Sequence, residues 1–243
     1  MKLNKSIMDW DQLVEDECFF IGLEVLDNFP HDKVMTWQGK RYEMTVQKGT
    51  NRQGESVFFE IPREVQDPHV SACLQLFEAQ PLRERVTGKS LTESIRSGIS
   101  RGLSSMVLED VWLPTSALVF FQVLAKYFPN HRPILADFDY LPTRIPGYNA
   151  PLVQKKNKER KAVELGTYLV EEGSCDIFYP TEFAYLQLLY RSVTGRTSKF
   201  LKQSAFLREY GNIEETTLKS GWNPMLEEYK NVSILLSDGE RKS

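Results

Sequence analysis

Acidic side chains follow a short apolar run near the start of the sequence. The run Cys18–Leu23 ends at Glu24, and Asp27 and Asn28 come next. A continuous apolar run of this length predicts a strand buried on both faces, as strands of parallel sheets are. Ligands of open α/β sheets bind just outside the carboxyl ends of the strands, so this edge is where chemistry is expected. The alternative is that Asp27 and Asn28 only cap a short helix.

A second apolar segment ends in acids in the same way. An apolar helix is predicted over Ala117–Phe128, and it leads into a strand over Arg132–Asp139. Asp137 and Asp139 stand at the end of this strand. Because the arrangement repeats that of the first acidic segment, we expect both acidic ends at the same edge of one sheet.

The loop over residues 146–151 has the sequence Pro-Gly-Tyr-Asn-Ala-Pro. Proline fixes φ and glycine permits unusual backbone angles, so the path of this loop is closely defined. Tyr148 and Asn149 would present an aromatic face and an amide to a ligand at the acidic edge. The alternative is a loop that only caps the fold, because Pro-Gly turns are common in any protein.

Residues 33–62 alternate polar and apolar side chains around glycine turns. The pattern predicts an antiparallel strand insertion, with a hairpin of Lys33–Trp37 and Arg41–Val46 followed by a strand over Ser56–Ile61. Such a meander could serve as a platform for a peptide. A solvated extension of the sheet is the interpretation that we favour.

The other predicted elements complete an α/β chain. In order, they are a helix within Asp67–Arg85, a less regular helix over Leu91–Leu108, an entry turn at Val111–Thr115, a flexible basic loop at 155–161, a strand over Thr167–Val170, helices over Ala184–Tyr190 and Phe200–Tyr210, a final strand over Asn231–Leu236 and a tail at 237–243.

Charge and hydropathy exclude several classes of function. The 30 basic residues nearly cancel the 33 acidic residues, so nothing favours nucleic-acid binding or a membrane-surface role. The longest apolar stretch, around Ala117–Ala125, is far shorter than the roughly 20 residues that span a bilayer, so no membrane insertion is expected. The cysteines and histidines are scattered without metal-ligand spacing, which predicts free thiols and no metal site.

The segment GLEVLDNFPHDKV at residues 22–34 resembles the strand-and-turn signature of the mitochondrial complex I assembly factor type of S-adenosylmethionine-dependent methyltransferase, a group that includes protein arginine methyltransferases. In that family an apolar strand ends in Asn-Glu or His-Glu, followed by two apolar residues, an Asp and Leu-Pro. Glu24 and Asp27 match, and Phe29-Pro30 replaces Leu-Pro. Leu23 stands where the family has Asn or His, which indicates a divergent branch.

Further segments are similar to a fungal-type branch of the same family. They are residues 111–115, 130–139 and 145–154, and the Asp-Ile-Phe-Tyr-Pro-Thr-Glu-Phe run at 176–183 resembles a late Asp-containing segment of the family. The resemblance implies a Rossmann-like methyltransferase sheet. It also implies transfer of a methyl group from S-adenosylmethionine to a nitrogen, here of an arginine in a protein partner such as a complex I subunit.

With that implied chemistry, the candidate catalytic residues are Glu24, which would grip the guanidinium, and Asp27. The candidate substrate-binding residues are Asn28, Asp137, Asp139, Tyr148 and Asn149. The resemblance implies a mitochondrial location. The first residues show neither a presequence pattern nor a secretory signal, so a cytoplasmic location is the alternative.

The glycine-rich turn that holds the cofactor in Rossmann-like methyltransferases has no counterpart in the sequence, because G-x-G spacing occurs nowhere. We therefore interpret residues 1–243 as a single carboxyl-terminal portion of a methyltransferase domain without its cofactor-loop half, and no cofactor-binding residue can be named. A non-catalytic assembly protein and a fragment of a longer gene product are the alternatives. A sheet cut there exposes an apolar edge, which predicts aggregation or pairing with another chain.

Overall fold

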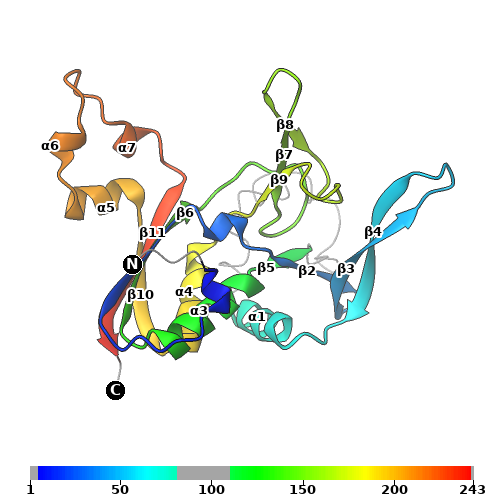
Figure 1. Ribbon diagram of the computed structural model, residues 1–243, viewed down its shortest axis with the longest axis horizontal. Helices are drawn as coiled ribbons and strands as arrows, with labels where there is room; N and C mark the ends of the chain where they lie inside the picture. The colour runs from blue at the N-terminus through cyan, green and yellow to red at the C-terminus, as the bar shows by residue number, and fades with distance from the viewer. Residues whose placement is uncertain (1–4, 81–109, 242–243) are drawn as a thin grey trace, which may run out of the picture. The chain divides into compact units, whose positions relative to one another are not determined.

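The computed structural model describes residues 5–80 and 110–241, and these residues form two compact units (Figure 1). The first unit contains residues 1–29, 116–141 and 180–243, and the second unit contains residues 30–115 and 142–179. The strand insertion predicted at 33–62 belongs to the second unit. The interpretation of the chain as a single portion of one domain stays a prediction.

A four-stranded sheet forms the centre of the first unit (Figure 1). Its strands, in spatial order, are β1 (Cys18–Leu23), β6 (His131–Phe138), β11 (Val232–Arg241) and β10 (Arg196–Lys202). β1 and β6 run parallel, with Ile21 opposite Ile134, whereas β11 is antiparallel to both of its neighbours. The prediction that both acidic segments follow parallel strands of one sheet is therefore confirmed.

Two helices cover one face of this sheet, α3 (Thr115–Tyr127) and α4 (Phe183–Thr194). The ring of Phe20 in β1 packs edge-on against that of Phe120 in α3, with the ring centroids 5.2 Å apart. Phe121 makes the same kind of contact with Tyr190 of α4 at 5.3 Å, so the two helices lie side by side. α3 confirms the apolar helix predicted over Ala117–Phe128, and α4 confirms the helix predicted over Ala184–Tyr190.

Another helix packs on the opposite face, over the middle of the sheet. This helix, α5 (Gln203–Tyr210), contributes Phe206 to an apolar cluster with Ala136 of β6 and with Val232 and Ile234 of β11. Successive residues of a strand point to opposite faces, so the cluster lies on the face away from α3 and α4.

β1 is buried on one face only. Burial alternates along the strand, and the Phe19, Ile21 and Leu23 side chains are 66%, 63% and 63% exposed. The prediction of a strand buried on both faces was wrong. The reason is its position, because β1 is the edge strand and, within the described ranges, helix packing reaches it only on the face of Phe20.

Pairing between distant segments overrides the local pattern near the carboxyl terminus. Residues 196–202 join the sheet as β10, so the helix predicted over Phe200–Tyr210 begins only at Gln203. The final strand continues to Arg241, so the tail predicted at 237–243 is strand in part. Both changes have one cause, since the added residues of β10 and β11 pair with each other.

The second unit contains another four-stranded sheet, in the order β4-β3-β2-β5. Its strands are β2 (Asp32–Trp37), β3 (Lys40–Thr50), β4 (Ser56–Glu64) and β5 (Val111–Leu113). The predicted antiparallel insertion is confirmed, and Gln38 and Gly39, both at positive φ, form the two-residue turn of its hairpin. The entry turn predicted at Val111–Thr115 was wrong, because Val111 pairs with Val34 and begins a short strand.

The helix predicted within Asp67–Arg85 is α1 (Pro68–Ala79). The Asp67 carboxylate caps it by accepting hydrogen bonds from the backbone N–H groups of His69 (2.7 Å) and Val70 (3.2 Å). The helix predicted over Leu91–Leu108 lies outside the described residues.

A three-stranded sheet in the order β8-β7-β9 completes the second unit. Its strands are β7 (Leu152–Lys156), β8 (Ala162–Leu165) and β9 (Asp176–Phe178). The loop predicted at 155–161 begins too early, because Lys156 pairs with Ala162 across a hairpin. The strand predicted over Thr167–Val170 is wrong, since that segment joins no sheet and β7 pairs with β8 and β9 instead.

Lys33 forms ion pairs at both edges of the four-stranded sheet of the second unit. The Lys33 ammonium lies 2.8 Å from carboxylate oxygens of both Glu60 and Asp110, and 5.1 Å from the ring centroid of Trp112. Burial by itself lowers the pKa of Lys33, but the hydrogen bonds and charges of the two carboxylates outweigh burial and raise it. The lysine therefore stays charged and links β2, β4 and the residue before β5.

The loop at 146–151 docks directly on β5. The backbone N–H of Trp112 donates to the Tyr148 carbonyl at 3.0 Å, and the Tyr148 N–H donates to the Asp110 carbonyl at 2.8 Å. Gly147 has a φ of 133°, and a Cβ there would lie 2.2 Å from Cζ3 of Trp112 and 2.7 Å from the Asp110 carbonyl oxygen. Only glycine fits at this position.

We predict that Gly147→Ala destabilises the protein by about 3 kcal/mol or more, because the added methyl group overlaps a buried tryptophan and backbone oxygen. Gly39→Ala is the matched control, since Gly39 also has positive φ but nothing lies within 4 Å of its added Cβ. It should lose only about 1 kcal/mol. Chemical denaturation measures both variants, and equal losses would contradict the close packing of the loop.

Candidate functional site

Glu24 leaves β1 in a conformation that is unusual for a residue with a side chain. Its φ is 51°, in the left-handed region, and its side chain is exposed. Its backbone N–H donates to the Ala136 carbonyl at 2.9 Å, which continues the parallel pairing one residue beyond the strand. Left-handed backbone at a non-glycine residue costs about 1–3 kcal/mol and concentrates at functional sites.

A buried carboxylate on β6 holds the turn that follows Glu24. Asp137 is fully buried, and its Oδ2 accepts hydrogen bonds from the backbone N–H groups of Leu26 (2.7 Å) and Asp27 (3.1 Å). Its Oδ1 accepts from the N–H of Phe138 at 2.8 Å. Asp137 therefore fixes this turn and does not face solvent. The fixed turn determines the position of Glu24, which precedes it.

Asp27 and Asn28 lie inside this turn. Leu26–Asn28 form a single 3₁₀ turn. The N-cap residue is Val25, and no side chain makes a capping hydrogen bond there. The alternative in which Asp27 and Asn28 cap a helix is therefore wrong, because both residues are part of the turn itself. Asp27 is 2% exposed and its Oδ1 accepts a 2.6 Å hydrogen bond from the Asn28 amide.

Burial raises the pKa of both carboxyl groups, Asp137 and Asp27. Burial, with the nearby Asp27 charge, raises the pKa of Asp137 to about 6 against the opposing effect of the three backbone N–H groups. Burial also raises the pKa of Asp27, which the Asn28 hydrogen bond opposes and the charge of Glu24 reinforces. The edge can therefore hold a proton close to neutral pH, which a site that exchanges protons requires.

Asp139 follows the same strand but serves different contacts. Its carboxylate forms an ion pair with Lys202 and accepts a hydrogen bond from the Ser233 hydroxyl. Its backbone N–H donates to the Asn231 carbonyl at 2.8 Å. These bonds join the end of β6 to β10 and β11, so the Asp139 carboxylate is already paired.

Tyr148 and Asn149 belong to the second unit, whereas the five acidic and amide candidates belong to the first unit. The ring centroids of Tyr148 and Phe77 lie 5.1 Å apart. Asn149 has a φ of 59°, and its amide donates to the Trp112 carbonyl at 3.4 Å. Both side chains thus make contacts that hold the loop in place within the second unit.

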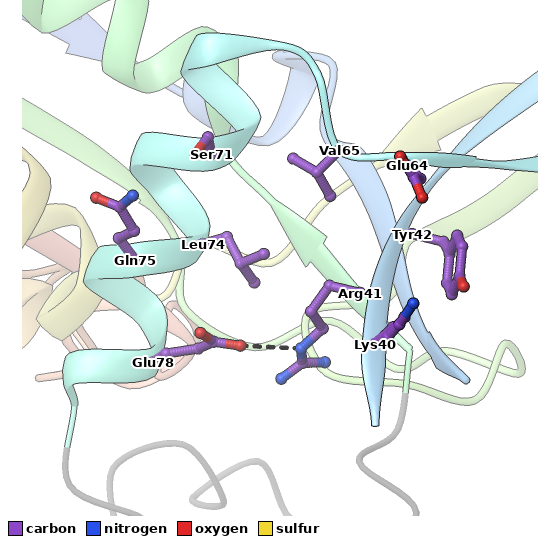
Figure 2. Close-up of a pocket in the computed structure, with 9 residues that line it drawn as sticks. All are labelled: Lys40, Arg41, Tyr42, Glu64, Val65, Ser71, Leu74, Gln75 and Glu78. Atoms are coloured by element: carbon purple, nitrogen blue, oxygen red, sulfur yellow. Dashed lines mark hydrogen bonds and ion pairs between the residues drawn. The ribbon is translucent and has the colours of Figure 1, made fainter. Parts of the chain in front are cut away.

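A cleft of about 440 Å³ between α1 and the β3–β4 hairpin is the cavity that sequence reasoning missed. Figure 2 shows the Arg41 guanidinium facing the Glu78 carboxylate across it, at 2.9 Å. Lys40 and Glu64 add one further charge of each sign. No local motif marks this cleft, because its walls come from three separate segments, residues 40–42, 64–65 and 71–78. Its charges are balanced, and it does not include any of the residues discussed above.

Two other kinds of site are not found where the structure describes the chain. Within residues 5–80 and 110–241, no three His, Cys, Asp or Glu side chains gather as metal ligands would. No helix in the same ranges is both long enough and apolar enough to cross a membrane.

The first unit thus has acidic residues at the ends of two parallel strands of a mixed α/β sheet. Residues 3–201 match the family described as "Putative S-adenosyl-L-methionine-dependent methyltransferase", and the chain belongs to this family. The family is dependent on S-adenosylmethionine as its cofactor.

One curated relative and two solved structures are similar to this chain. The chain is 21% identical over 210 residues to a fission yeast (Schizosaccharomyces pombe) protein named protein arginine methyltransferase NDUFAF7 homolog, mitochondrial. It is similar to a COG1565 superfamily protein of Burkholderia thailandensis bound to S-adenosyl-homocysteine (TM-score 0.56, 17% identity). It is also similar to a native COG1565 superfamily structure from that bacterium (TM-score 0.55, 15% identity).

The chain spans only part of each of these proteins. The alignments cover 84%, 96% and 94% of this chain, but 45% of the yeast relative and 57% of each bacterial structure. The bacterial structures therefore support the methyltransferase fold over about half of their own length.

The sequence has no pair of glycines at G-x-G spacing, which is the spacing of the turn that holds the cofactor in Rossmann-like methyltransferases. Gly39 and Gly54 lie in hairpin turns, Gly195 ends α4, and an added Cβ at Gly147 would overlap Trp112. Gly166 directly follows β8, and an added Cβ there would meet nothing within 4 Å.

We predict that the pH dependence of stability reports the buried carboxyl of Asp137. Its folded pKa of about 6 exceeds the ordinary value of 3.8, so the folded protein binds more protons than the unfolded chain between these values. The stabilisation is therefore full below about pH 4 and lost as pH rises through 6. Asp137→Asn cannot ionise, and the unfolding free energy of the wild type minus that of the variant should fall by about 3 kcal/mol from pH 4 to pH 7.

Urea denaturation of both proteins at four pH values measures this difference. A difference that stays constant with pH, or that rises toward neutrality, would contradict the elevated pKa.

Proposed function

We propose that this chain provides the acceptor side of a protein arginine methyltransferase. The observation that carries the proposal is the position of Glu24 at the carboxyl end of a parallel strand. Its carboxylate is exposed, its backbone is left-handed, and the buried Asp137 holds the turn that follows it through a hydrogen bond. Ligands of α/β sheets bind at this end of the strands. The family and the name of the yeast relative support the reaction class and the protein substrate.

The chemistry of arginine requires such a group. A guanidinium keeps its proton in water because its pKa exceeds about 12, so its nitrogen loses a proton only as a new bond forms. A carboxylate can hold two N–H groups of the guanidinium in parallel, orient one nitrogen and accept the proton that leaves it. Glu24 is the candidate for both roles, since its carboxylate is exposed whereas that of Asp27 is buried.

The remaining candidates take positioning roles in this proposal. Asp27 and Asn28 order the turn through their mutual hydrogen bond, and Asp137 holds that turn from β6. Asp139 fastens the strand ends through Lys202 and Ser233. For Tyr148 and Asn149, the contacts with Phe77 and Trp112 favour a role in shaping the loop.

We infer the partner and the cellular compartment of this chain from its relatives. The yeast protein is named as mitochondrial and as a protein arginine methyltransferase, and we propose the same compartment and substrate class here. A complex I subunit is the candidate acceptor, on the family resemblance alone.

A second candidate function is a non-catalytic assembly protein that binds a partner. The observation in its favour is that the sequence has no pair of glycines at G-x-G spacing. The two functions differ in whether Glu24 matters for methylation.

We expect Glu24→Gln to lower arginine methylation by about a hundredfold or more, because the amide cannot accept the proton and pairs poorly with a guanidinium. The tagged protein, purified from its own cells with whatever it binds, is incubated with tritiated S-adenosylmethionine and extract from cells lacking it. Amino-acid analysis then measures methylarginine.

Glu214→Gln is the matched control, an exposed glutamate of the short helix α6 (Ile213–Thr216), and should keep full activity. Cofactor retention, measured on the same samples, should be equal in all three proteins. Equal methylation by wild type and Glu24→Gln would remove Glu24 from the mechanism, and no methylation by the wild type would favour the assembly role.

A further inference from the structure

The hairpin between β7 and β8 carries a cluster of positive charge in the second unit. Residues 155–161, which we call the basic tip, contain five cations and one acid and so have a net charge of +4 (5 minus 1). The whole chain has a net charge of −3, so the rest of it has a net charge of −7 (−3 minus 4). The cations of the basic tip are Lys155, Lys156, Lys158, Arg160 and Lys161.

The basic tip extends beyond the sheet that anchors it. β9 pairs only with residues 152–154 of β7, so the hairpin continues past β9 as two strands and a turn (Figure 1). Lys155 lies opposite Val163, and Lys156 lies opposite Ala162. Because successive residues of a strand point to opposite faces, the positive charge lies on both faces of the hairpin.

Asn157 gives the turn of this hairpin a defined path. Its Oδ1 accepts hydrogen bonds from the backbone N–H groups of Glu159 (3.0 Å) and Lys161 (2.9 Å). Its backbone N–H donates to the Lys161 carbonyl, and its carbonyl accepts from the Arg160 N–H, both at 2.9 Å. These bonds use backbone groups and the asparagine amide, so the turn does not need the cationic side chains to hold its shape.

The cations of the basic tip are all exposed. Across the described ranges none of them forms an ion pair, whereas the ammonium of Lys33 and the guanidinium of Arg41 do. The carboxylate of Glu159, the acid of the basic tip, accepts a 3.3 Å hydrogen bond from the Asn157 amide. Clustered like charges repel one another, so an anionic ligand that binds here relieves that repulsion.

Arg160 has a backbone conformation that favours glycine. Its φ is 61°, in the left-handed region, which is unfavourable for a residue with a Cβ. A glycine would adopt this conformation without that strain, so the arginine stands here at a cost to the fold. Such strain concentrates at positions where the side chain has a function.

We propose that the basic tip binds an acidic segment of the acceptor protein. This rests on the proposed function, because it names the class of protein whose arginine reaches Glu24. Such an acceptor presents a cation to the acidic edge of the first unit and an anionic segment to the basic tip. A protein rich in arginine and lysine is repelled by the basic tip, which therefore selects acidic acceptors.

A protein segment fits this surface better than a nucleic acid or a membrane does. The chain from Lys155 to Lys158 spans at most about 10 Å, the length of about three extended residues. The net charge of −7 on the rest of the chain repels the remainder of a phosphate polymer. Stable attachment of a short basic segment to a membrane also requires apolar side chains that enter the lipid, and residues 155–161 contain none.

Peptide binding by the purified protein tests the proposal. In one variant the five cations of the basic tip are replaced by glutamine, and in the matched control five exposed cations elsewhere are replaced by glutamine, so both variants lose the same charge. The control positions are Arg52, Arg63, Arg208, Lys219 and Lys230.

Fluorescence anisotropy measures the binding of an oligoglutamate peptide and of an oligoglutamine peptide. We expect the wild type and the control variant to bind oligoglutamate about tenfold more tightly than oligoglutamine, and the basic-tip variant to lose this preference. High salt should weaken the preference, because the charges are exposed. The melting temperature of the basic-tip variant should stay that of the wild type, since Asn157 holds the turn.

Three results would overturn the proposal. They are a wild type without preference for oligoglutamate, an equal loss of preference in both variants, which indicates an effect of total charge, and binding of phosphatidylserine vesicles or duplex RNA that depends on the basic tip while oligoglutamate binding does not.

Arginine methylation separates this proposal from the proposed function. With tritiated S-adenosylmethionine and extract from cells lacking the protein, the basic-tip variant should form about tenfold less methylarginine than the control at low extract concentration. It should match the control at high concentration, because docking changes KM and not the chemical step.

The two proposals fail in different ways. If the wild type forms no methylarginine, the proposed function fails, whereas oligoglutamate binding that depends on the basic tip still supports an acidic binding surface. If methylation requires Glu24 but is equal in the basic-tip and control variants at low extract concentration, the proposed function stands and the selection of acidic acceptors is overturned.

Discussion

The acidic edge depends on one buried carboxylate that accepts backbone hydrogen bonds across two strands. Asp137 is fully buried, and its oxygens bind the N–H groups of Leu26 and Asp27 in the turn and of Phe138 in its own strand. Without them, the turn after β1 would leave its N–H groups buried and unpaired, at about 1–3 kcal/mol each. The left-handed backbone of Glu24 is tolerable because these bonds determine the path of the residues that follow it.

Local pattern was sufficient where a segment's own residues decide its structure. The apolar run of β1, the apolar helix α3 and the alternation of β2 to β4 were all predicted, because each is long or strongly patterned. β5 has three residues and exists because Val111 pairs with Val34, far away in the chain. β10 is polar along much of its length and is a strand only through β11, so neither could be predicted locally.

The candidate site shows the same limit at the level of single residues. Asp137 and Asp139 look alike in the sequence, as two acids at the end of one strand. Their roles differ because of what lies opposite, which is backbone N–H for Asp137 and Lys202 with Ser233 for Asp139. The sequence also misled about the surroundings of β1. The composition of a short apolar strand does not show whether one face or both faces of the strand are buried.

The order of construction of the site follows from where its bonds lie. The hydrogen bonds that Asp137, Asp27 and Asn28 make in the Glu24 turn all lie within the first unit. The exposed side chains of β1, Phe19, Ile21 and Leu23, take no part in these bonds. A group that is already positioned loses little entropy when a ligand binds, so the hydrogen bonds of Asp137 preorganise the turn that follows Glu24.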